Sequence, residues 1–110
     1  MRDEPLTIED LGNQGPGRKL KLSGPLTIST LFEFQNLARE DSPNGLILDL
    51  TNVPYVDSAG VGALVGAYVR QQKEGHSVTL VGVNDRVRST LKVTRVESFF
   101  RYSGGKSQVA

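Results

Sequence analysis

One segment in the middle of the chain is almost continuously apolar, and it places the tightest limit on the fold. Residues 46–50 read Leu-Ile-Leu-Asp-Leu, a pattern typical of a central strand that is covered on both faces of a sheet. Apolar residues then recur from Val61 to Tyr68 with the i, i+3, i+4, i+7 spacing of one helix face, and Gly75 is a stop signal. Because strands separated by helices need crossover connections, the sheet is predicted to be largely parallel.

The rest of the chain supplies further strands and helices in alternation. Residues 6–11 and 18–22 flank a Gly-rich turn, which predicts a β-hairpin. The order indicates one α/β domain over residues 1–110, with its core at about 5–102 and a flexible tail at 103–110. The remaining predicted elements are a helix from about Thr30 with Leu31, Phe34 and Ala38 inward, a strand at 77–83, a helix capped by Asn84 or Asp85 with Val87, Leu91 and Thr94 inward, and a short helix or strand at 96–102.

Two local features of the predicted helices carry expectations about packing. Thr30 and Glu33 have the spacing of a capping box, which would begin the first helix. Gly60, Gly62 and Gly66 each disfavour the second helix by about 1 kcal/mol relative to Ala. A helix that keeps three such residues is expected to approach the sheet closely, and Gly60 and Gly62 would alternatively allow the close approach of a partner.

The composition argues against several classes of chemistry. The 110 residues include no Cys and one His, so no disulfide, no thiolate nucleophile and no metal site built on sulfur or on several His side chains is expected. The net charge of +1 argues against binding to nucleic acid or to an anionic membrane. No apolar run approaches a membrane span, and the charged residues 2–4 occupy the place where a signal peptide has an apolar stretch. A cytoplasmic domain without a cofactor is predicted.

The small net charge hides an uneven distribution along the chain. Residues 1–60 hold 5 basic against 9 acidic side chains, whereas residues 84–110 hold 6 basic against 2 acidic. A solvated helix face accounts for such a basic cluster in most proteins. A docking face for an acidic partner is the functional alternative, and charge alone leaves both open.

Two catalytic motifs are approached but not completed. Residues 12–19 have the glycine spacing of a phosphate-binding P-loop, but Arg18 and Lys19 stand where a lysine and a hydroxyl residue are required. Ser58 has the setting of a hydrolase nucleophile, but the first Gly of G-x-S-x-G is missing and His76 is the only available base. A plain turn and a surface histidine are the favoured interpretations. The chain is therefore predicted not to be an enzyme.

Residues 57–60, Asp-Ser-Ala-Gly, lie where a loop is predicted to become a helix. Ser58 is a favoured N-cap residue, because its oxygen can accept a hydrogen bond from an N–H of the first turn. The same place suits a phosphoserine, since a helix N-terminus carries positive partial charge and free N–H groups. The residues alone support a plain structural role, at the cap or beside it, and a phosphorylation switch about equally.

The stretch from residue 46 to 64 resembles the signature of the STAS domain, specifically that of the bacterial anti-sigma factor antagonists. The resemblance extends over about residues 5–102. It implies a four- to five-stranded, mostly parallel or mixed sheet with helices packed around it. The motif residues that carry it are Asp49, Leu50, Asp57, Ser58 and Gly60.

The resemblance also implies a function in partner switching. In that scheme the unphosphorylated antagonist binds an anti-sigma factor, which is itself a serine kinase and phosphorylates the motif serine, here Ser58. A PP2C-type phosphatase reverses the reaction. Asp57 would shape the loop, and the helix that carries Arg86 would flank the docking surface. The partner-binding residues implied in this way are Thr27, Asp57, Ser58, Ala59, Gly60 and Arg86.

This chain departs from the family pattern at two positions. Thr27 stands where many members carry Asp, which removes a negative charge near the switch loop. Ala59 stands where a second serine is common, so Ser58 is the only hydroxyl in the tetrapeptide. The alternative function is that of a structural STAS subunit of a scaffold or a lipid-transport complex, in which Ser58 is not phosphorylated.

Overall fold

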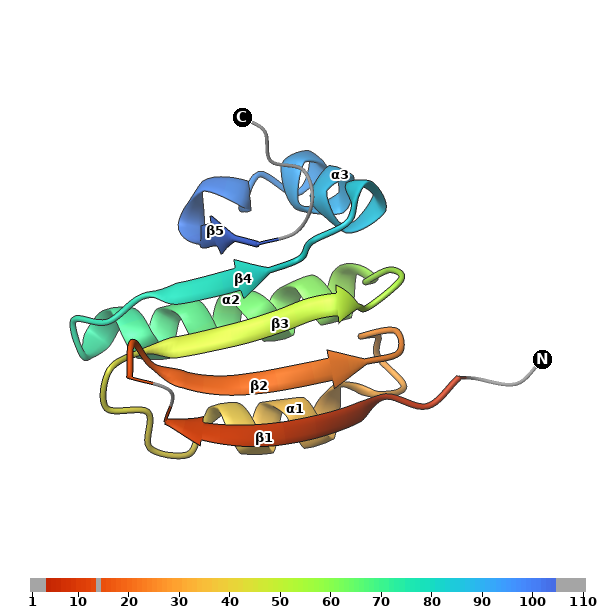
Figure 1. The fold of residues 1–110 in the computed structure, drawn as a ribbon. Helices are drawn as coiled ribbons and strands as arrows, with labels where there is room; N and C mark the ends of the chain where they lie inside the picture. The colour runs from red at the N-terminus through yellow and green to blue at the C-terminus, as the bar shows by residue number, and fades with distance from the viewer. Residues whose placement is uncertain (1–3, 14, 105–110) are drawn as a thin grey trace.

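Five strands form one mixed sheet in the order β1-β2-β3-β4-β5 (Figure 1). The computed structural model describes residues 4–13 and 15–104. β1 runs antiparallel to β2, which confirms the predicted hairpin, and each later pair of neighbours is parallel. The predicted α/β fold class is therefore confirmed. The strands are β1 (Thr7–Asn13), β2 (Arg18–Ser23), β3 (Leu46–Asn52), β4 (Val78–Val81) and β5 (Arg101–Ser103).

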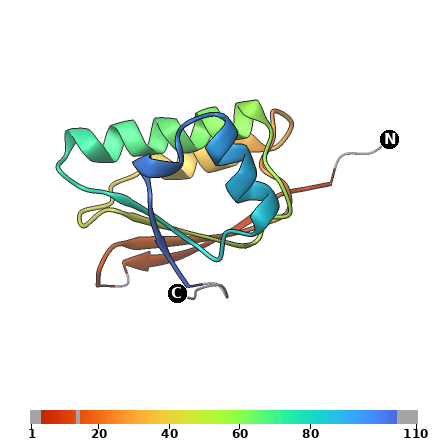
Figure 2. The same ribbon diagram turned by 90° about the horizontal axis from the view of Figure 1, so that it is seen from above.

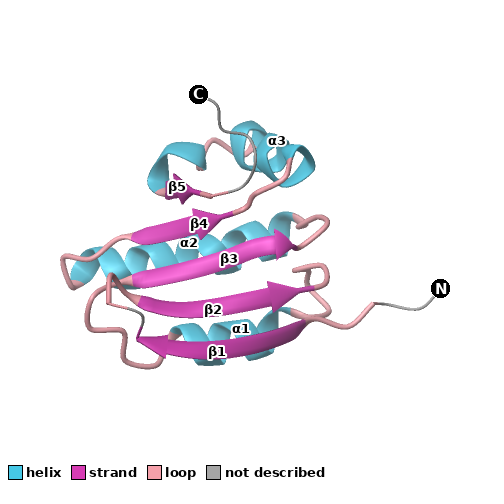
Figure 3. Cartoon of the chain, viewed as in Figure 1, coloured by secondary structure: helices cyan, strands magenta, loops and turns pink. Residues whose placement is uncertain are grey.

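Helices connect the parallel strands (Figure 3). Two of them, α1 and α2, lie side by side on one face of the sheet, whereas α3 lies beside the edge formed by β4 and β5 (Figures 1 and 2). No helix in the described part of the chain is both long and apolar enough to cross a membrane. The helices are α1 (Leu31–Ala38), α2 (Ser58–Lys73), α3 (Asp85–Val93) and the short 3-10 helix η1 (Glu97–Phe99).

The central strand β3 is covered on one face only. Leu46, Leu48 and Leu50 are at most 1% exposed and point toward the helices, while Ile47 and Asp49 remain partly exposed on the other face. The prediction that this strand is covered on both faces is therefore wrong. The strands from β2 to β5 follow one another in chain order, so right-handed crossovers place α1 and α2 on the same side.

The predicted inward residues of α1 and α3 are buried with one exception, whereas on the predicted face of α2 Val65 and Tyr68 are only partly buried. The predicted inward residues of α1 are all buried, and so are two of the three predicted for α3. The exception is Thr94, which is exposed because it is the C-cap of α3. Its hydroxyl donates a hydrogen bond to the Thr90 carbonyl oxygen at 2.8 Å, so the side chain turns back along the helix.

The start of α1 differs from the predicted capping box. Thr30 is the N-cap, but its side chain makes no cap hydrogen bond. Its hydroxyl instead donates to the Pro25 carbonyl oxygen at 2.8 Å and accepts the Thr27 N–H at 2.9 Å. The Thr30 N–H donates to the Thr27 carbonyl oxygen, so Glu33 is not needed as its acceptor. The hydroxyl of Thr30 therefore closes the turn before the helix.

The last predicted apolar element, at 96–102, contains both a helical turn and a strand, η1 followed by β5. β5 extends to Ser103, whose carbonyl oxygen accepts the Gly82 N–H at 3.1 Å. The sheet thus continues one residue into the segment expected to be a flexible tail. Residues 105–110 of that tail lie outside the described residues.

A buried arginine joins the hairpin to α1. Arg18, at the P-loop lysine position, is 6% exposed. Its Nη1 donates to the Leu37 carbonyl oxygen at 2.7 Å, and its Nη2 lies 2.7 Å from Asp10 Oδ2 and 3.3 Å from Glu40 Oε1. The guanidinium therefore fixes the C-terminal end of α1 against β1 and β2. Arg18 has a structural role, which the P-loop spacing did not indicate.

The variant Asp10→Asn is expected to change how stability depends on pH. The side-chain hydrogen bond from Arg18 and the backbone hydrogen bond from Gly12 hold the pKa of Asp10 below its usual value of 3.8. A carboxyl group with a lowered pKa in the folded state stabilises the fold above the unfolded value, and this contribution is lost as the pH falls through the folded value. In urea denaturation, wild type should therefore be more stable than Asp10→Asn at neutral pH, and the two should converge in strong acid.

The control variant is Glu40→Gln, because the Glu40 side chain is 62% exposed and its ion pair with Arg18 is the longer one. Exposed pairs of this kind contribute about 1 kcal/mol or less. Glu40→Gln should follow the wild-type pH profile closely. A stability difference between wild type and Asp10→Asn that stays constant with pH contradicts the assignment.

Candidate functional site

Ser58 is the first residue of α2, and its side chain lies at the surface. The N-cap of this helix is Asp57, whose Oδ1 accepts the Gly60 N–H at 2.8 Å. Ser58 is therefore not the cap but lies beside it, which leaves both the structural role and the switch open. Within residues 4–13 and 15–104, nothing forms a hydrogen bond with its hydroxyl. The hydroxyl is exposed at a helix N-terminus and is not used by the fold.

Asp57 uses its second carboxylate oxygen to bind another segment. Oδ2 accepts the N–H of Ile28 at 3.1 Å, and Ile28 lies in the turn between β2 and α1. The backbones are paired beside this contact, since the Leu26 N–H donates to the Tyr55 carbonyl oxygen and the Asp57 N–H donates to that of Leu26. One carboxylate therefore holds the turn at residues 27–30 against the N-terminus of α2.

The three glycines of α2 have different surroundings. A Cβ placed on Gly60 would lie 2.1 Å from the Leu26 carbonyl oxygen, so this position requires glycine. Gly62 and Gly66 are exposed, and a Cβ on either would meet nothing within 4 Å. A close approach is present at Gly60, but its neighbour is the turn after β2 and not a strand, and the expected approach to the sheet is wrong at Gly62 and Gly66. Approach of a partner at Gly62 stays a prediction. Gly66 instead lines a shallow groove between α1 and α2.

Thr27 organises the turn that Asp57 holds. Its hydroxyl oxygen accepts the Ser29 N–H at 3.2 Å, and its carbonyl oxygen accepts the Leu31 N–H at 2.9 Å. Ala59, next to Ser58, is partly buried. The structure therefore brings the predicted residues Thr27 and 57–60 to one junction between two loops.

Arg86 is connected to this junction by the segment between β3 and α2. Its guanidinium lies 4.8 Å from the centroid of the Tyr55 ring, in a cation–π contact. Asn84 caps α3 by accepting the Val87 N–H at 2.7 Å, and its amide nitrogen donates to the Val53 carbonyl oxygen at 3.2 Å. The N-terminal end of α3 is thus attached to the segment between β3 and α2, which places Arg86 beside that segment.

Asp49, the other acidic residue of the motif, serves the end of β3. Its Oδ1 accepts both the N–H and the hydroxyl of Thr51, at 3.0 and 2.7 Å. Partial burial raises the pKa of Asp49, but the hydrogen bonds from Thr51 and the charges of Lys19 and Lys21 outweigh this effect and lower it. The carboxylate is therefore a structural group on the open face of the sheet.

The hydrolase arrangement considered for Ser58 is not formed. Ser58 begins α2, and His76 follows the end of this 16-residue helix. The two residues are thus separated by about 24 Å along the helix axis. A nucleophile and its base need hydrogen-bond contact. Among the described residues, no group of three or more His, Cys, Asp or Glu side chains is placed to hold a metal ion.

The structure adds two apolar residues that the sequence pattern did not single out. Ile28 is 60% exposed and Phe32 is 64% exposed. Ile28 lies in the turn held by Asp57, and Phe32 lies in the first turn of α1. Phe32 is adjacent to the buried Leu31 and lies off the apolar face of α1, which is the signal that would have indicated its exposure. We call Ile28, Phe32 and Ser58 the junction surface.

The variants Gly60→Ala and Gly62→Ala should have opposite effects on stability. The methyl group at position 60 would collide with the Leu26 backbone, and overpacking of this kind costs about 1–3 kcal/mol. At position 62 the methyl group meets open space, and replacing an exposed helical glycine by alanine stabilises by up to about 1 kcal/mol. Urea denaturation measures both values. Equal effects at the two positions contradict the described packing.

The variants Asp57→Ala and Asp57→Asn should separate the two roles of this carboxylate. Loss of the cap in Asp57→Ala should cost about 1–2 kcal/mol. An asparagine has one side-chain acceptor oxygen, so Asp57→Asn should keep the Gly60 cap and lose the bond from Ile28. Hydrogen exchange should then accelerate at the Ile28 amide while the Gly60 amide stays protected. Unchanged exchange at Ile28 contradicts the bridging role.

Sequence comparison finds relatives of two kinds, an anti-sigma factor antagonist and a phospholipid-transport binding protein. The chain is 26% identical over 90 residues to the anti-sigma-B factor antagonist of Staphylococcus aureus (strain NCTC 8325 / PS 47), a match that covers 79% of this chain and 83% of that protein. It is 35% identical over 86 residues to the intermembrane phospholipid transport system binding protein MlaB of Escherichia coli (strain K12), covering 77% of this chain and 88% of that protein.

The fold is shared with a solved structure, an anti-sigma factor antagonist from Mycobacterium paratuberculosis. The TM-score is 0.76 at 21% sequence identity, and the match covers 93% of this chain and 86% of that chain. The family model named STAS domain matches residues 10–107, which include the whole junction. With its strand order, its helix start at residue 58 and this match, the chain belongs to the STAS domain family.

Proposed function

We propose that this protein is an anti-sigma factor antagonist whose partner binding is switched by phosphorylation of Ser58. It binds an anti-sigma factor with serine kinase activity while Ser58 is unmodified, and it dissociates after phosphorylation. A PP2C-type phosphatase then restores binding. The observation that carries the proposal is the exposed hydroxyl of Ser58, which the fold leaves unused because Asp57 is the cap. In this function the chain is a kinase substrate in the cytoplasm and not itself an enzyme.

The position of Ser58 allows a phosphate without loss of the fold. A phosphoserine carries a charge of about −1.5 to −2 at neutral pH. At the first residue of α2 this charge meets the positive end of the helix dipole and the free N–H groups of the first turn. The side chain is exposed, so the phosphate oxygens remain hydrated. These features support modification of the folded protein.

The same phosphate would change the junction surface in two ways. It would place a negative charge near the turn that carries Ile28, whose apolar side chain is 60% exposed. It would also lie next to the Asp57 carboxylate, which holds the turn through the Ile28 N–H. Like charges at adjacent positions repel, which weakens a partner contact that needs a neutral, ordered surface.

A structural STAS subunit of a lipid-transport complex is the second candidate function. The observation that favours it is the 35% identity with MlaB, over 88% of that protein. In this case the junction surface binds a permanent partner, and a charge on Ser58 plays no regulatory part. The two candidates therefore differ in whether Ser58 is modified and whether binding responds to it.

The phosphorylation switch is tested with the anti-sigma kinase of the same organism. Incubation with the kinase and ATP should add the mass of one phosphate, and the addition should vanish in Ser58→Ala. Ser58→Asp should weaken binding to the unphosphorylated kinase by at least about tenfold, because a charge is placed in the interface. Calorimetry or surface plasmon resonance measures this binding.

Ser98 offers the matched control, because it is an exposed serine in η1, at the C-terminal end of the chain. The Ser98→Ala variant should still gain one phosphate, at Ser58. The Ser98→Asp variant should bind the kinase as tightly as wild type does. If Ser58 stays unmodified and Ser58→Asp binds as tightly as wild type, the switch is wrong. A stable complex that is insensitive to Ser58→Asp supports the structural subunit instead.

A further inference from the structure

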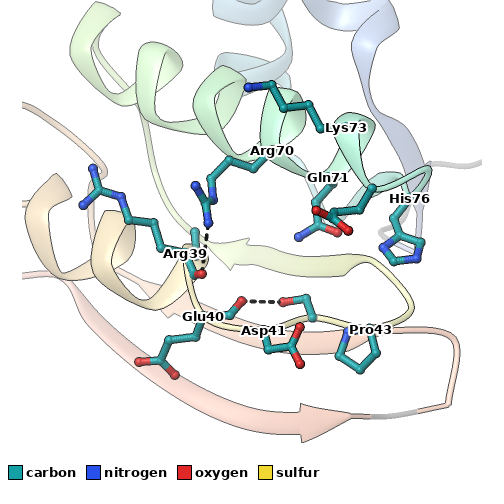
Figure 4. Close-up of a pocket in the computed structure, with 11 residues that line it drawn as sticks. Arg39, Glu40, Asp41, Pro43, Arg70, Gln71, Lys73 and His76 are labelled. Carbon is teal, nitrogen blue, oxygen red and sulfur yellow. Dashed lines mark hydrogen bonds between the residues drawn. The ribbon is translucent and has the colours of Figure 1, made fainter.

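A second candidate site lies at the opposite end of α2 from Ser58. A cavity of about 310 Å³ opens between the C-terminal ends of α1 and α2 (Figure 4). One wall comes from residues 38–43, between α1 and β3, and the other from the last turns of α2 and the loop that follows. The volume lies at the lower end of the range for small-molecule pockets.

One wall of this cavity holds a buried amide oxygen that has no hydrogen-bond partner among the described residues. Gln71 is 6% exposed, and within the described residues no donor reaches its Oε1. The buried Nδ1 of His76, in the same wall, also lacks a partner among those residues. Buried side-chain polar atoms are hydrogen-bonded in the large majority of cases. A carboxamide oxygen can only accept, so this wall is suited to a ligand that donates N–H or O–H groups.

The charge around the cavity is mixed and balanced. Both α1 and α2 end here, and the negative ends of their dipoles favour a positive group nearby. Figure 4 shows the Asp41 side chain on the wall between α1 and β3, across the cavity from Gln71 and His76. The Arg70 guanidinium uses Nη2 to donate to the Arg39 carbonyl oxygen at 3.2 Å, and its other N–H groups form no hydrogen bond with the described residues. The lining includes three basic and three acidic side chains: Arg39, Arg70, Lys73, Glu40, Asp41 and Glu74.

We propose that this cavity binds a small zwitterion of the free α-amino-acid type. The ammonium group donates to Gln71 Oε1 and faces the Asp41 carboxylate on the other wall, and the carboxylate group faces the Arg70 guanidinium. This orientation supplies a donor to the unsatisfied Gln71 oxygen and pairs each ligand charge with a charge of opposite sign. The site is separate from the junction surface, so it does not depend on the function proposed for Ser58.

The test is a titration of the ¹⁵N-labelled full chain with the common free L-amino acids, one at a time, followed by NMR. The ligand is raised to about 10 mM, which is ample for a millimolar Kd. At least one amino acid should shift the backbone amide signals of Gln71, His76 and Asp41 and leave those of Thr27 and Ser58 in place. If no amino acid shifts the first three signals, the proposal is overturned.

The chain offers a matched pair of variants for this site, the neighbouring residues Gln71 and Gln72. Gln71→Leu removes the buried acceptor and should weaken binding at least tenfold, while its melting temperature stays equal to or above that of wild type. Gln72 is exposed, so Gln72→Leu should bind as wild type. Should Gln71→Leu fail to fold, Arg70→Gln provides the second variant, again with at least tenfold weaker binding. Wild-type affinity in the folded Gln71 or Arg70 variant overturns the site.

The role of the ammonium group is tested with a ligand that lacks N–H donors. The trimethylated form of the amino acid that binds keeps both charges but has no N–H, so it should bind at least tenfold more weakly. Equal binding of the two compounds overturns the proposed orientation. Ser58→Asp should bind the amino acid as wild type does, which separates this result from the outcome of the phosphorylation experiment.

Discussion

The carboxylate of Asp57 is the contact on which the geometry of the junction surface depends. One oxygen caps α2 at Gly60 and the other holds Ile28, which lies 29 residues earlier in the chain. The absence of a side chain at Gly60 lets the Leu26 backbone approach the helix. Two loops that are distant in sequence therefore form one surface with Ser58 at its edge. A charge added to Ser58 would lie next to the carboxylate that joins these two loops.

Local patterns predict the elements of this fold well, and the arrangement between elements poorly. The hairpin, the inward residues of α1 and the boundaries of α2 follow from periodicity and turn residues, which are properties of neighbouring positions. The covered face of β3 does not follow from its own residues. It depends on the sheet adding strands in chain order, so that both crossover helices lie on one side. A nearly continuous apolar run therefore overstated the burial of this strand.

Single residues of the site show the same difference between what local sequence predicts and what tertiary contacts decide. The motif correctly placed Ser58 at a helix start, but the identity of the cap and the partner of the second Asp57 oxygen are tertiary facts. Gly60 and Gly62 are alike in sequence and differ only in what faces them. For Gln71 a signal existed, because it follows the buried Leu64 and Ala67 at helical spacing. A polar residue on an apolar helix face indicates a buried polar group. Which partner that group can bind depends on the neighbouring loop.

The two sites occupy opposite ends of the same helix dipole. A phosphate on Ser58 is favoured by the positive end of α2, and an ammonium group beside Gln71 is favoured by the negative end. The ends are about 24 Å apart, well beyond the screening length of about 8 Å at physiological salt. Direct coupling between the two charges is therefore weak. Any influence of one site on the other has to pass through the packing of α2 against the sheet, where Leu64 and Ala67 are buried and rigidly held. The two sites should accordingly bind their ligands independently.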